Sequence, residues 1–359
     1  MSLSIAIVGL PNVGKSTLFN ALTRADILAA NYPFATIEPN TGIVPVPDPR
    51  LGVLETMYKS QKVIPATVTF VDIAGLVAGA SKGEGLGNKF LDNIRKTDAV
   101  VHVVRAFEND DILRHDETPV DPKSDIEIIN TELILADLQT IEKHLPKLQK
   151  ESKTKPALRD TMTYLESLQR HLSEGTPLSS LPSIDEEKIS DLHLLTAKPV
   201  IYAFNVDENT LTDESRKSEL TNLVAPAKAM FVCAKLEEEI KDLTEIEAQE
   251  LLSSYGVEET GLQQLIHSAY ETLGLQSYLT AGPDEVRAWT IHHGDTAPQA
   301  AGVIHGDFER GFIAASIVDY DDLVAAGSEQ AAKAAGKVRT EGKTYVMQPG
   351  DIVEFRFNV

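Results

Sequence analysis

The sequence has one cysteine, no long hydrophobic run and no leader-like N-terminus. The single Cys233 excludes an intramolecular disulfide and a cysteine-rich zinc module, and it suggests a reducing compartment. No stretch approaches the roughly 18 consecutive apolar residues of a membrane-spanning helix. The first residues, MSLSIAIVGLPNVGKS, lack the basic segment and the small-residue cleavage site of a signal peptide. We therefore expect a cytoplasmic protein with no membrane partner.

Positive charge is also scarce. Lys and Arg total 33 against 54 Asp and Glu, which gives a net charge of −21 over 359 residues. A chain this acidic is not expected to bind nucleic acid over its whole surface, so any contact with RNA requires a local basic patch. The composition is otherwise that of a globular protein, with 42% hydrophobic residues, and the length predicts two or three domains.

Five apolar runs are expected to be strands. They are Ser4–Val8, Ala66–Ile73, Ala99–Arg105, Pro199–Asn205 and Ala229–Cys233. Helices are predicted over Lys15–Arg24 and Gly261–Leu273. Apolar runs separated by helical stretches indicate a parallel sheet that is covered on both faces, so the sequence predicts an α/β fold.

The stretch of about 90 residues between the third and fourth runs is longer than a crossover needs. Apolar residues recur there at steps of three and four: Ile134, Leu138, Ile141, Leu145 and Leu148, then Leu158, Met162, Leu165 and Leu172. A polar turn over residues 151–156 separates the two sets. This spacing predicts an inserted antiparallel helical pair, the alternative being a hairpin packed flat on the sheet. Pro146 is expected to kink or shorten the first helix.

From about Thr280 the pattern indicates a separate α+β module of about 80 residues. We expect strands over Val286–Ile291 and Gly311–Val318, with a helix over Pro298–Phe308 between them. Thr344–Gln348 and Ile352–Val359 are joined by a Pro-Gly-Asp turn, and we expect them to form a terminal hairpin.

The segment GLPNVGKS, residues 9–16, fits the pattern GxxxxGK[ST] and stands directly between a strand and a helix. Its glycines let backbone N–H groups point at phosphate oxygens, and the following helix adds the positive end of its dipole. Lys15 is expected to reach the β- and γ-phosphates, and the Ser16 hydroxyl is expected to bind Mg²⁺. The loop residues predicted to bind the nucleotide are Asn12, Val13, Gly14, Lys15, Ser16 and Thr17.

Further residues around this loop fit a nucleoside triphosphate. Asp72 opens a DxxG sequence after the second strand, and its carboxylate is expected to hold Mg²⁺ through water while the Gly75 N–H touches the γ-phosphate. Thr36 lies in a loop from which it can close over the metal. The glycine-dense residues 75–87 favour a mobile switch, the alternative being a disordered linker.

Two features depart from the usual GTPase pattern. Leu76 stands where many small GTPases have the glutamine that orients the attacking water, and leucine cannot hydrogen-bond to water. Asn12 could help to bind K⁺, the alternative being that it only caps the loop.

The segment that should read the base, Asn205-Val206-Asp207-Glu208, replaces the guanine-specific NKxD. The extra methylene of glutamate can move the carboxylate by about 1.5 Å, which would spoil a two-point contact with guanine. The preference for GTP is therefore weakened, and ATP becomes plausible. Cys233 and Ala234 follow the fifth strand and are expected to flank the base.

These segments resemble the YchF/Obg-like ATPase family, a branch of the Obg-related, translation-factor-type P-loop NTPases. The resemblance is carried by GLPNVGKSTLFNALT from Gly9, NYPFATIEPNTG from Asn31 and DIAGLVAGASKGEGLGNKFL from Asp72. FEND from Phe107, NVDE from Asn205, AGPDEVRAW from Ala281 and the final GDIVEFRFNV extend it over essentially the whole chain.

The resemblance implies a G-type P-loop domain over residues 1–122 and 196–280, an inserted antiparallel helical (coiled-coil) domain over 123–195 and a C-terminal TGS domain of β-grasp fold over 281–359. It implies preference for ATP with GTP sometimes accepted, Mg²⁺ dependence, and binding to ribosomes or ribosomal subunits. In the family a histidine after FEND assists hydrolysis, but that position holds Arg114 here and the histidine, His115, is shifted by one. The catalytic candidates are Lys15, Thr36, Gly75 and His115.

The leading interpretation is an ATP-hydrolysing switch protein associated with ribosomes, in translation or a stress response. The alternatives are a GTPase with a degenerate base motif and a ribosome-binding adaptor in which the nucleotide is mainly structural. Contact with ribosomal RNA is expected in residues 330–345, where Lys333, Lys337, Arg339 and Lys343 face Glu341 alone. The alternative there is a solvated, flexible loop.

Overall fold

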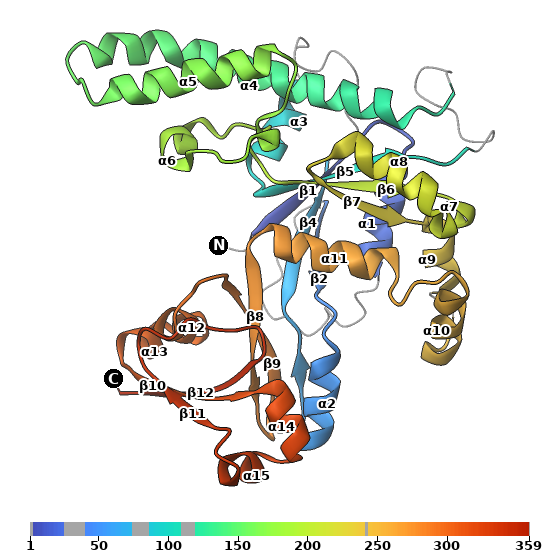
Figure 1. The fold of residues 1–359 in the computed structure, drawn as a ribbon, viewed down its shortest axis with the longest axis vertical. Helices are drawn as coiled ribbons and strands as arrows, with labels where there is room; N and C mark the ends of the chain where they lie inside the picture. Colours follow the sequence, from blue (N-terminus) through green and yellow to red (C-terminus); the bar gives the residue numbers. More distant parts are fainter. Residues whose placement is uncertain (1–2, 25–39, 74–85, 109–118, 241–242, 359) are drawn as a thin grey trace. The chain divides into compact units, whose positions relative to one another are not determined.

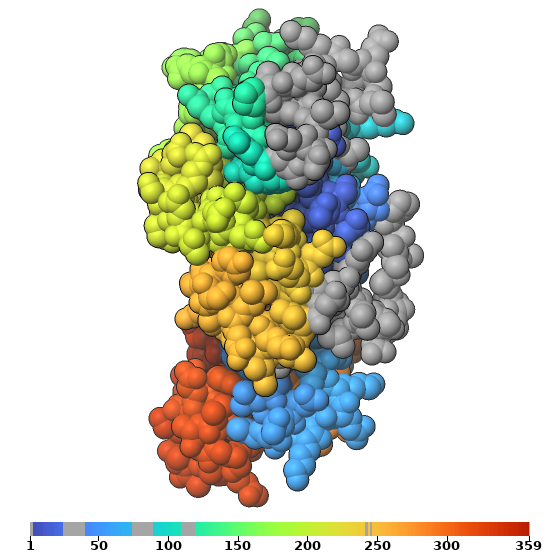
Figure 2. Space-filling model, turned by 90° about the vertical axis from the view of Figure 1, so that its right-hand side faces the viewer, coloured from blue at the N-terminus to red at the C-terminus, as the bar shows by residue number. Residues whose placement is uncertain are grey.

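The computed structural model describes residues 3–24, 40–73, 86–108, 119–240 and 243–358, and the chain divides into two compact units (Figure 1). Unit 1 comprises Met1–Val44 and Thr69–Ala269, and unit 2 comprises Pro45–Val68 and Tyr270–Val359. These boundaries differ from the expected domains, because residues 45–68 pack with the C-terminal residues. Figure 2 shows this segment, in light blue, directly beside the red C-terminal residues of the same unit.

The main sheet of unit 1 has six strands in the order β2-β4-β1-β5-β6-β7. They are β1 (Ser4–Val8), β2 (Thr41–Pro45), β4 (Thr67–Asp72), β5 (Ala99–Arg105), β6 (Val200–Asn205) and β7 (Lys228–Val232). β1 pairs in parallel with β4 and β5, β5 pairs in parallel with β6, and β6 with β7. Every residue of β5 is buried, which is why its mostly apolar sequence indicates a central strand. The predicted α/β fold is confirmed.

Helices connect and accompany these strands. Those of unit 1 are α1 (Lys15–Arg24), α3 (Leu86–Arg95), α4 (Pro122–Ser152), α5 (Leu158–Ser173), α6 (Glu186–Ile189), α7 (Glu208–Thr212), α8 (Glu214–Val224), α9 (Ala234–Ile240), α10 (Glu245–Ser254) and α11 (Gly261–Thr272), the last of which ends in unit 2. In the part of the chain that the structure describes, no helix is both long enough and apolar enough to cross a lipid bilayer.

The antiparallel helical pair is confirmed as α4 and α5, which run side by side (Figure 1). The first half of α4 packs on β5 through side chains such as Ile129, and the second half packs on α5. The pair has a hydrophobic core of its own, which includes Ile141, Leu145 and Leu165. α4 continues through Pro146 to Ser152, so of the two effects expected of this proline, a kink or a shortening, the shortening does not occur: burial of Leu145 and its neighbours outweighs the hydrogen bond that proline removes.

The sheet of unit 2 has six strands in the order β11-β10-β12-β8-β9-β3. They are β3 (Val63–Ile64), β8 (Leu275–Ala281), β9 (Val286–His292), β10 (Phe312–Asp319), β11 (Arg339–Glu341) and β12 (Asp351–Phe357). β12 pairs antiparallel with β10 and parallel with β8. The expected terminal hairpin is therefore wrong: Val346 makes only an isolated bridge to Thr296, and burial of Val353 beside Ile317 selects the distant partner.

The helices of unit 2 are α2 (Pro49–Tyr58), α12 (Ala297–Ile304), α13 (Gly306–Arg310), α14 (Tyr320–Ala326) and α15 (Glu329–Ala334). The single helix expected over Pro298–Phe308 is divided in two. His305 adopts an extended backbone, and its side chain accepts the N–H of Asp307 to start α13. The TGS designation of this unit stays a prediction.

Candidate nucleotide-binding site

The loop between β1 and α1 has the backbone that a phosphate-binding loop requires. Gly9, Asn12 and Gly14 have φ values of +155°, +63° and +101°. A Cβ on Gly9 would lie 2.5 Å from the Val103 carbonyl oxygen, and one on Gly14 would lie 2.4 Å from Nδ2 of Asn205. Both positions therefore need glycine, because the loop lies directly against the ends of β5 and β6.

Asn205, at the end of β6, holds this loop from behind. Its buried side-chain amide donates a 3.1 Å hydrogen bond to the carbonyl of Val13. The backbone N–H of Val206 donates to the Val232 carbonyl at the end of β7. The asparagine that was expected to lie near the base thus also fixes the phosphate loop, a role that only the folded chain makes visible.

Lys15, the first residue of α1, is buried, and its ammonium donates to the Leu10 carbonyl at 2.5 Å. Burial lowers the pKa of Lys15 to about 8, and the carboxylate of Asp72 opposes this shift. A desolvated ammonium inside a loop of N–H groups forms a site for an anion, because a phosphate would supply the negative charge that burial withholds.

Asp72 and Ser16 come together beside Lys15. The Asp72 carboxylate at the end of β4 accepts a hydrogen bond from the Ser16 hydroxyl. Burial raises the pKa of Asp72, while the Lys15 ammonium and the Ser16 hydroxyl lower it. A carboxylate and a hydroxyl are hard oxygen ligands, and Mg²⁺ commonly uses few such protein groups together with waters and phosphate oxygens. Among the described residues no three His, Cys, Asp or Glu side chains gather as a metal site.

Four predicted site residues, Thr36, Gly75, Leu76 and His115, lie outside the described residues. The same holds for residues 75–85 of the glycine-dense stretch, whereas Gly87 lies within α3. The described part of the site therefore consists of the phosphate loop, the end of β4 and the loops after β6 and β7.

The loops after β6 and β7 form the end of the site expected to meet the base. Val206 is buried in the core beside Phe204, so its side chain replaces the guanine-stacking lysine with an inward-facing group. Glu208 begins α7, and its carboxylate forms an ion pair with Lys235 of α9 at 2.7 Å. This carboxylate is neutralised by a neighbour, which weakens it as an acceptor for guanine.

Cys233 and Ala234 occupy the turn into α9. The Cys233 side chain is buried, which raises the pKa of its thiol, and its carbonyl accepts the N–H of Glu237. The thiol is thus held neutral in the interior, and any contact of this turn with a base comes from the backbone and from Ala234.

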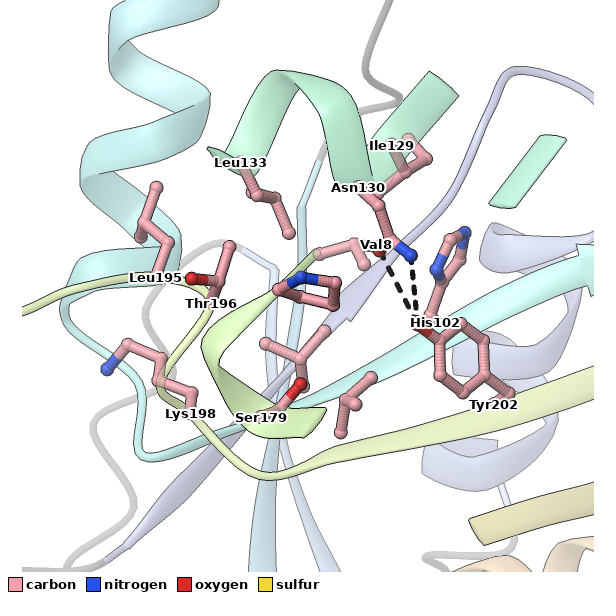
Figure 3. A pocket seen from close by; sticks show the side chains of 13 residues that line it. Val8, His102, Ile129, Asn130, Leu133, Ser179, Leu195, Thr196, Lys198 and Tyr202 are labelled. Atoms are coloured by element: carbon pink, nitrogen blue, oxygen red, sulfur yellow. Dashed lines mark hydrogen bonds between the residues drawn. The ribbon is translucent and has the colours of Figure 1, made fainter. Parts of the chain in front are cut away.

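Sequence reasoning missed His102, which lies on β5 behind the phosphate loop. Figure 3 shows its ring beside that of Tyr202, at 5.1 Å between centroids, and the Tyr202 hydroxyl bonded to Asn130 of α4. Burial, together with the nearby charge of Lys15, lowers the pKa of His102 to about 3, so the ring is neutral. The cavity that these groups line is about 20 Å³, enough for one water molecule and far too small for a nucleotide. A lone histidine in an apolar strand is the signal that could have revealed it.

The basic segment of unit 2 carries less uncompensated charge in the fold than its sequence suggested. Three of its four cations have a carboxylate partner: Lys333 pairs with Glu329, Lys337 with Asp322, and Arg339 with Asp351. For Lys343, no described carboxylate lies within ion-pair distance. Most of the positive charge of this segment is therefore locally compensated, which weakens the case for a phosphate contact at this place.

Two family matches agree with this architecture. Residues 4–158 match the family described as 50S ribosome-binding GTPase, and residues 275–358 match the YchF-GTPase C-terminal family, described as a protein of unknown function. The protein called ribosome-binding ATPase YchF is 51% identical in Haemophilus influenzae and 50% identical in Bacillus subtilis, with all of this chain and all of each relative covered.

Solved structures give the same result. The YchF GTPase of Schizosaccharomyces pombe superimposes with a TM-score of 0.86 at 40% identity, covering 99% of this chain and 98% of that one. A GTP-binding protein of Pyrococcus horikoshii, at 19% identity and a TM-score of 0.62, shares the fold. Full-length identity of about one half, together with the phosphate loop and its buried lysine, shows that the chain belongs to the YchF family of P-loop nucleotide-binding proteins.

Proposed function

We propose that the chain binds Mg²⁺–ATP and hydrolyses it, and that the bound nucleotide controls its association with ribosomes. The observation that supports this most directly is the phosphate loop itself, in which Lys15 is buried next to Ser16 and Asp72. The relatives of similar length are called ribosome-binding ATPases, which supports both the nucleotide and the partner.

The described residues can take distinct parts in hydrolysis. Lys15 would hold β- and γ-phosphate oxygens and stabilise the negative charge that develops on them. Ser16 and Asp72 would hold Mg²⁺, which supplies charge neutralisation and orientation of the phosphates. We keep Thr36, Gly75 and His115 as proposed contributors around the γ-phosphate. Because leucine follows Gly75, a group other than that side chain must orient the attacking water.

Preference for ATP over GTP is the finer part of the proposal. It is supported by the Glu208–Lys235 ion pair, which engages the carboxylate that stands at the position of the guanine-binding aspartate. Burial of Val206 supports it further, because no long side chain can stack on the base from that position. Cys233 and Ala234 would contact the base from the other side. A GTPase with a degenerate base motif is the alternative.

Calorimetric titration of the purified chain tests the nucleotide proposal. We expect ATP to bind more tightly than GTP, and ATP hydrolysis to depend on Mg²⁺. In Lys15→Ala the hydrolysis rate should fall by about 10²-fold or more, because one charge that stabilises the transition state is removed. Parallel titrations in K⁺ and Na⁺ test the K⁺ site proposed at Asn12. Equal affinities for ATP and GTP would favour the GTPase alternative, and near-normal hydrolysis by Lys15→Ala would refute the role of this loop.

The cellular part of the proposal is a cytoplasmic protein that binds the ribosome or one of its subunits, with contact to ribosomal RNA. It includes the division into a nucleotide domain, a helical insertion (123–195) and a TGS domain (281–359). The adaptor alternative predicts that Lys15→Ala still supports growth although it no longer hydrolyses ATP. Failure of that variant in cells that depend on the protein would favour the switch.

A further inference from the structure

The outer part of the α4–α5 pair is strongly positive in an acidic chain. Residues 143–159 contain six cations and one Glu, a net charge of +5 where the whole chain carries −21. The cations are Lys143, Lys147, Lys150, Lys153, Lys155 and Arg159, and all six are exposed. Figure 1 shows the turn between α4 and α5 at the end of the pair that lies farthest from the sheet of the same unit.

Three of these lysines form a stripe on one face of α4. Lys143, Lys147 and Lys150 follow at steps of four and three, which places them above one another over about 10 Å of helix. The residues that lie opposite, such as Ile141 and Leu145, are buried against α5. The lysine stripe therefore points away from the partner helix, with Lys153 and Lys155 in the turn that follows.

The charge of the lysine stripe is not compensated by any residue that the structure describes. Elsewhere in unit 1 a lysine such as Lys188 contacts both Asp160 and Asp185. Among the described residues, no carboxylate lies within ion-pair distance of any of the six cations. Of the nearest acidic groups in sequence, Asp160 is thus engaged by Lys188, and Glu142, Glu151 and Glu166 make no ion pair with the stripe.

Helix stability does not account for this arrangement. Lys150 lies in the last turn of α4, where a cation interacts favourably with the helix dipole. Lys143 and Lys147 lie one to two turns earlier, outside the reach of that effect. Like charges three and four residues apart repel each other along a helix. The stripe therefore costs stability and gains no ion pair from the part of the chain that the structure describes, which points to an external anion.

We propose that the lysine stripe binds the phosphate backbone of ribosomal RNA. The inference rests on the proposed ribosome association and names the surface that carries it. A row of flexible lysine ammonium groups suits phosphates that are recognised without regard to sequence. Apart from Pro146, the described surface beside the stripe has no exposed large apolar side chain for insertion into a membrane, and no aromatic anchor of the kind that dominates protein interfaces.

The test compares two triple variants of the full chain that remove the same charge. Lys143→Gln, Lys147→Gln and Lys150→Gln remove the stripe, while Lys333→Gln, Lys337→Gln and Arg339→Gln remove three ion-paired cations of unit 2. Cosedimentation with purified bacterial 70S ribosomes and anisotropy with a short RNA duplex are measured from 50 to 200 mM KCl. For the stripe variant we expect about tenfold weaker binding, and a slope of log affinity against log salt that is smaller by about 2 to 3. The unit 2 variant should bind ribosomes and the RNA duplex like the parent, and the ATP affinity of both variants should not change. The stripe variant should unfold at the parental temperature or slightly above it, because repulsion between neighbouring lysines is removed. Binding by the unit 2 variant is measured at a temperature at which circular dichroism shows it folded, because it lacks the ion-pair partner of the buried Asp351.

The outcomes distinguish failure of the RNA-binding stripe from failure of the proposed ribosome association. A stripe variant with parental affinity and slope overturns the inference, and so does an equal loss in both variants, because net charge alone would then explain the effect. If the parent binds the RNA duplex through the stripe but does not sediment with ribosomes, the ribosome association is refuted and the stripe remains an RNA-binding surface. If the parent binds neither, both fail. Stripe-dependent binding to phosphatidylserine vesicles in place of RNA would assign the surface to a membrane and overturn the inference.

Discussion

At the scale of single residues, the site depends on polar groups that the fold has removed from water. The ammonium of Lys15 has exchanged its hydration for one carbonyl and a nearby carboxylate. The amide of Asn205 has one protein acceptor, the Val13 carbonyl of the phosphate loop. Such groups are sensitive to change, because a buried polar partner left alone loses a hydrogen bond that water cannot replace.

The first prediction concerns the proton on Lys15. Its pKa of about 8 means that half of the molecules are unprotonated at pH 8 without nucleotide. A bound phosphate raises that pKa, so ATP binding at pH 8 should take up roughly half a proton, and affinity should fall as pH rises above 8. Calorimetry in buffers with different ionisation enthalpies measures the uptake. At pH 6.5 the lysine is already protonated before ATP binds, so Lys15 should contribute nothing to proton uptake.

Lys15→Arg is the matched control, because a guanidinium stays protonated throughout this range. If it binds ATP, it should do so without the proton uptake seen at pH 8. Uptake that is unchanged in this variant would place the titrating group elsewhere.

A second residue-scale prediction concerns Asn205. In Asn205→Ala the Val13 carbonyl loses its donor, which should cost about 1 to 3 kcal/mol of loop stability and lower ATP affinity by about tenfold or more. Titration calorimetry and thermal unfolding measure the two effects. Asn209→Ala, on the exposed side of α7, should change neither. Normal ATP affinity in Asn205→Ala would show that the loop keeps its shape without this hydrogen bond.

At the scale of elements, one buried polar side chain of α4 binds the chain that leads into β6, in addition to the hydrophobic packing between them. Asp137 is fully buried and accepts the backbone N–H groups of Leu195 and Thr196 and the Thr196 hydroxyl, at 2.7 to 2.8 Å. These hydrogen bonds oppose the effect of burial, which raises the pKa of Asp137. One carboxylate thereby joins the helical pair to the segment that precedes a central strand.

We predict that Asp137→Ala lowers the free energy of unfolding by about 3 kcal/mol, since two backbone donors and a hydroxyl lose a charged acceptor. Asp137→Asn should cost less, because it keeps one acceptor oxygen. Chemical denaturation measures both, and amide hydrogen exchange at Leu195 and Thr196 should rise in parallel. Glu142→Ala, on the exposed face of α4, is the control. An Asp137→Ala chain as stable as the control would show that the segment is held by packing alone.

The same scale shows where sequence reasoning succeeds and fails. β1 and β5 have the predicted bounds, because strands buried on both faces are continuous apolar runs. β8, with Gln276 and Ser277 among its apolar residues, gives no such run and was missed, although both polar side chains are buried. The terminal hairpin was wrong because β12 finds its partners far away in the chain, which local turn signals cannot reveal.

The candidate site follows the same division. The phosphate loop and Asp72 could be predicted, since that chemistry needs particular residues at fixed spacing. The ion pairs of Lys333 and Arg339 could not, because their partners come from other elements. The spacing of the lysines from Lys143 to Lys150 is visible in the sequence. That no described carboxylate lies close enough to pair with them could be learned only from the structure.

At the scale of the whole molecule, the chain passes between the two units three times. Unit 2 is therefore not a C-terminal domain alone: residues 45–68 supply α2, whose Leu51 and Leu54 are buried, and the edge strand β3, which pairs with β9.

We predict that a fragment of residues 270–359 unfolds without cooperativity and binds a hydrophobic dye, because it lacks α2 and β3. A synthetic peptide of residues 45–68 should restore a cooperative transition followed by circular dichroism, whereas a peptide with Leu51→Asp and Leu54→Asp should not. A fragment that melts cooperatively by itself would show that the inserted segment adds little to this unit.

This discontinuity also sets an order of events during synthesis. Residues 45–68 leave the ribosome about 200 residues before the partners of α2 and β3 have been made. At roughly 5 to 20 residues per second, the apolar face of α2 stays without its partners for about 10 to 40 seconds while the rest of the chain is synthesised. Unit 2 can close only when translation is nearly complete, so a slow codon cluster before residue 270 would lengthen the interval in which the nascent chain depends on chaperones.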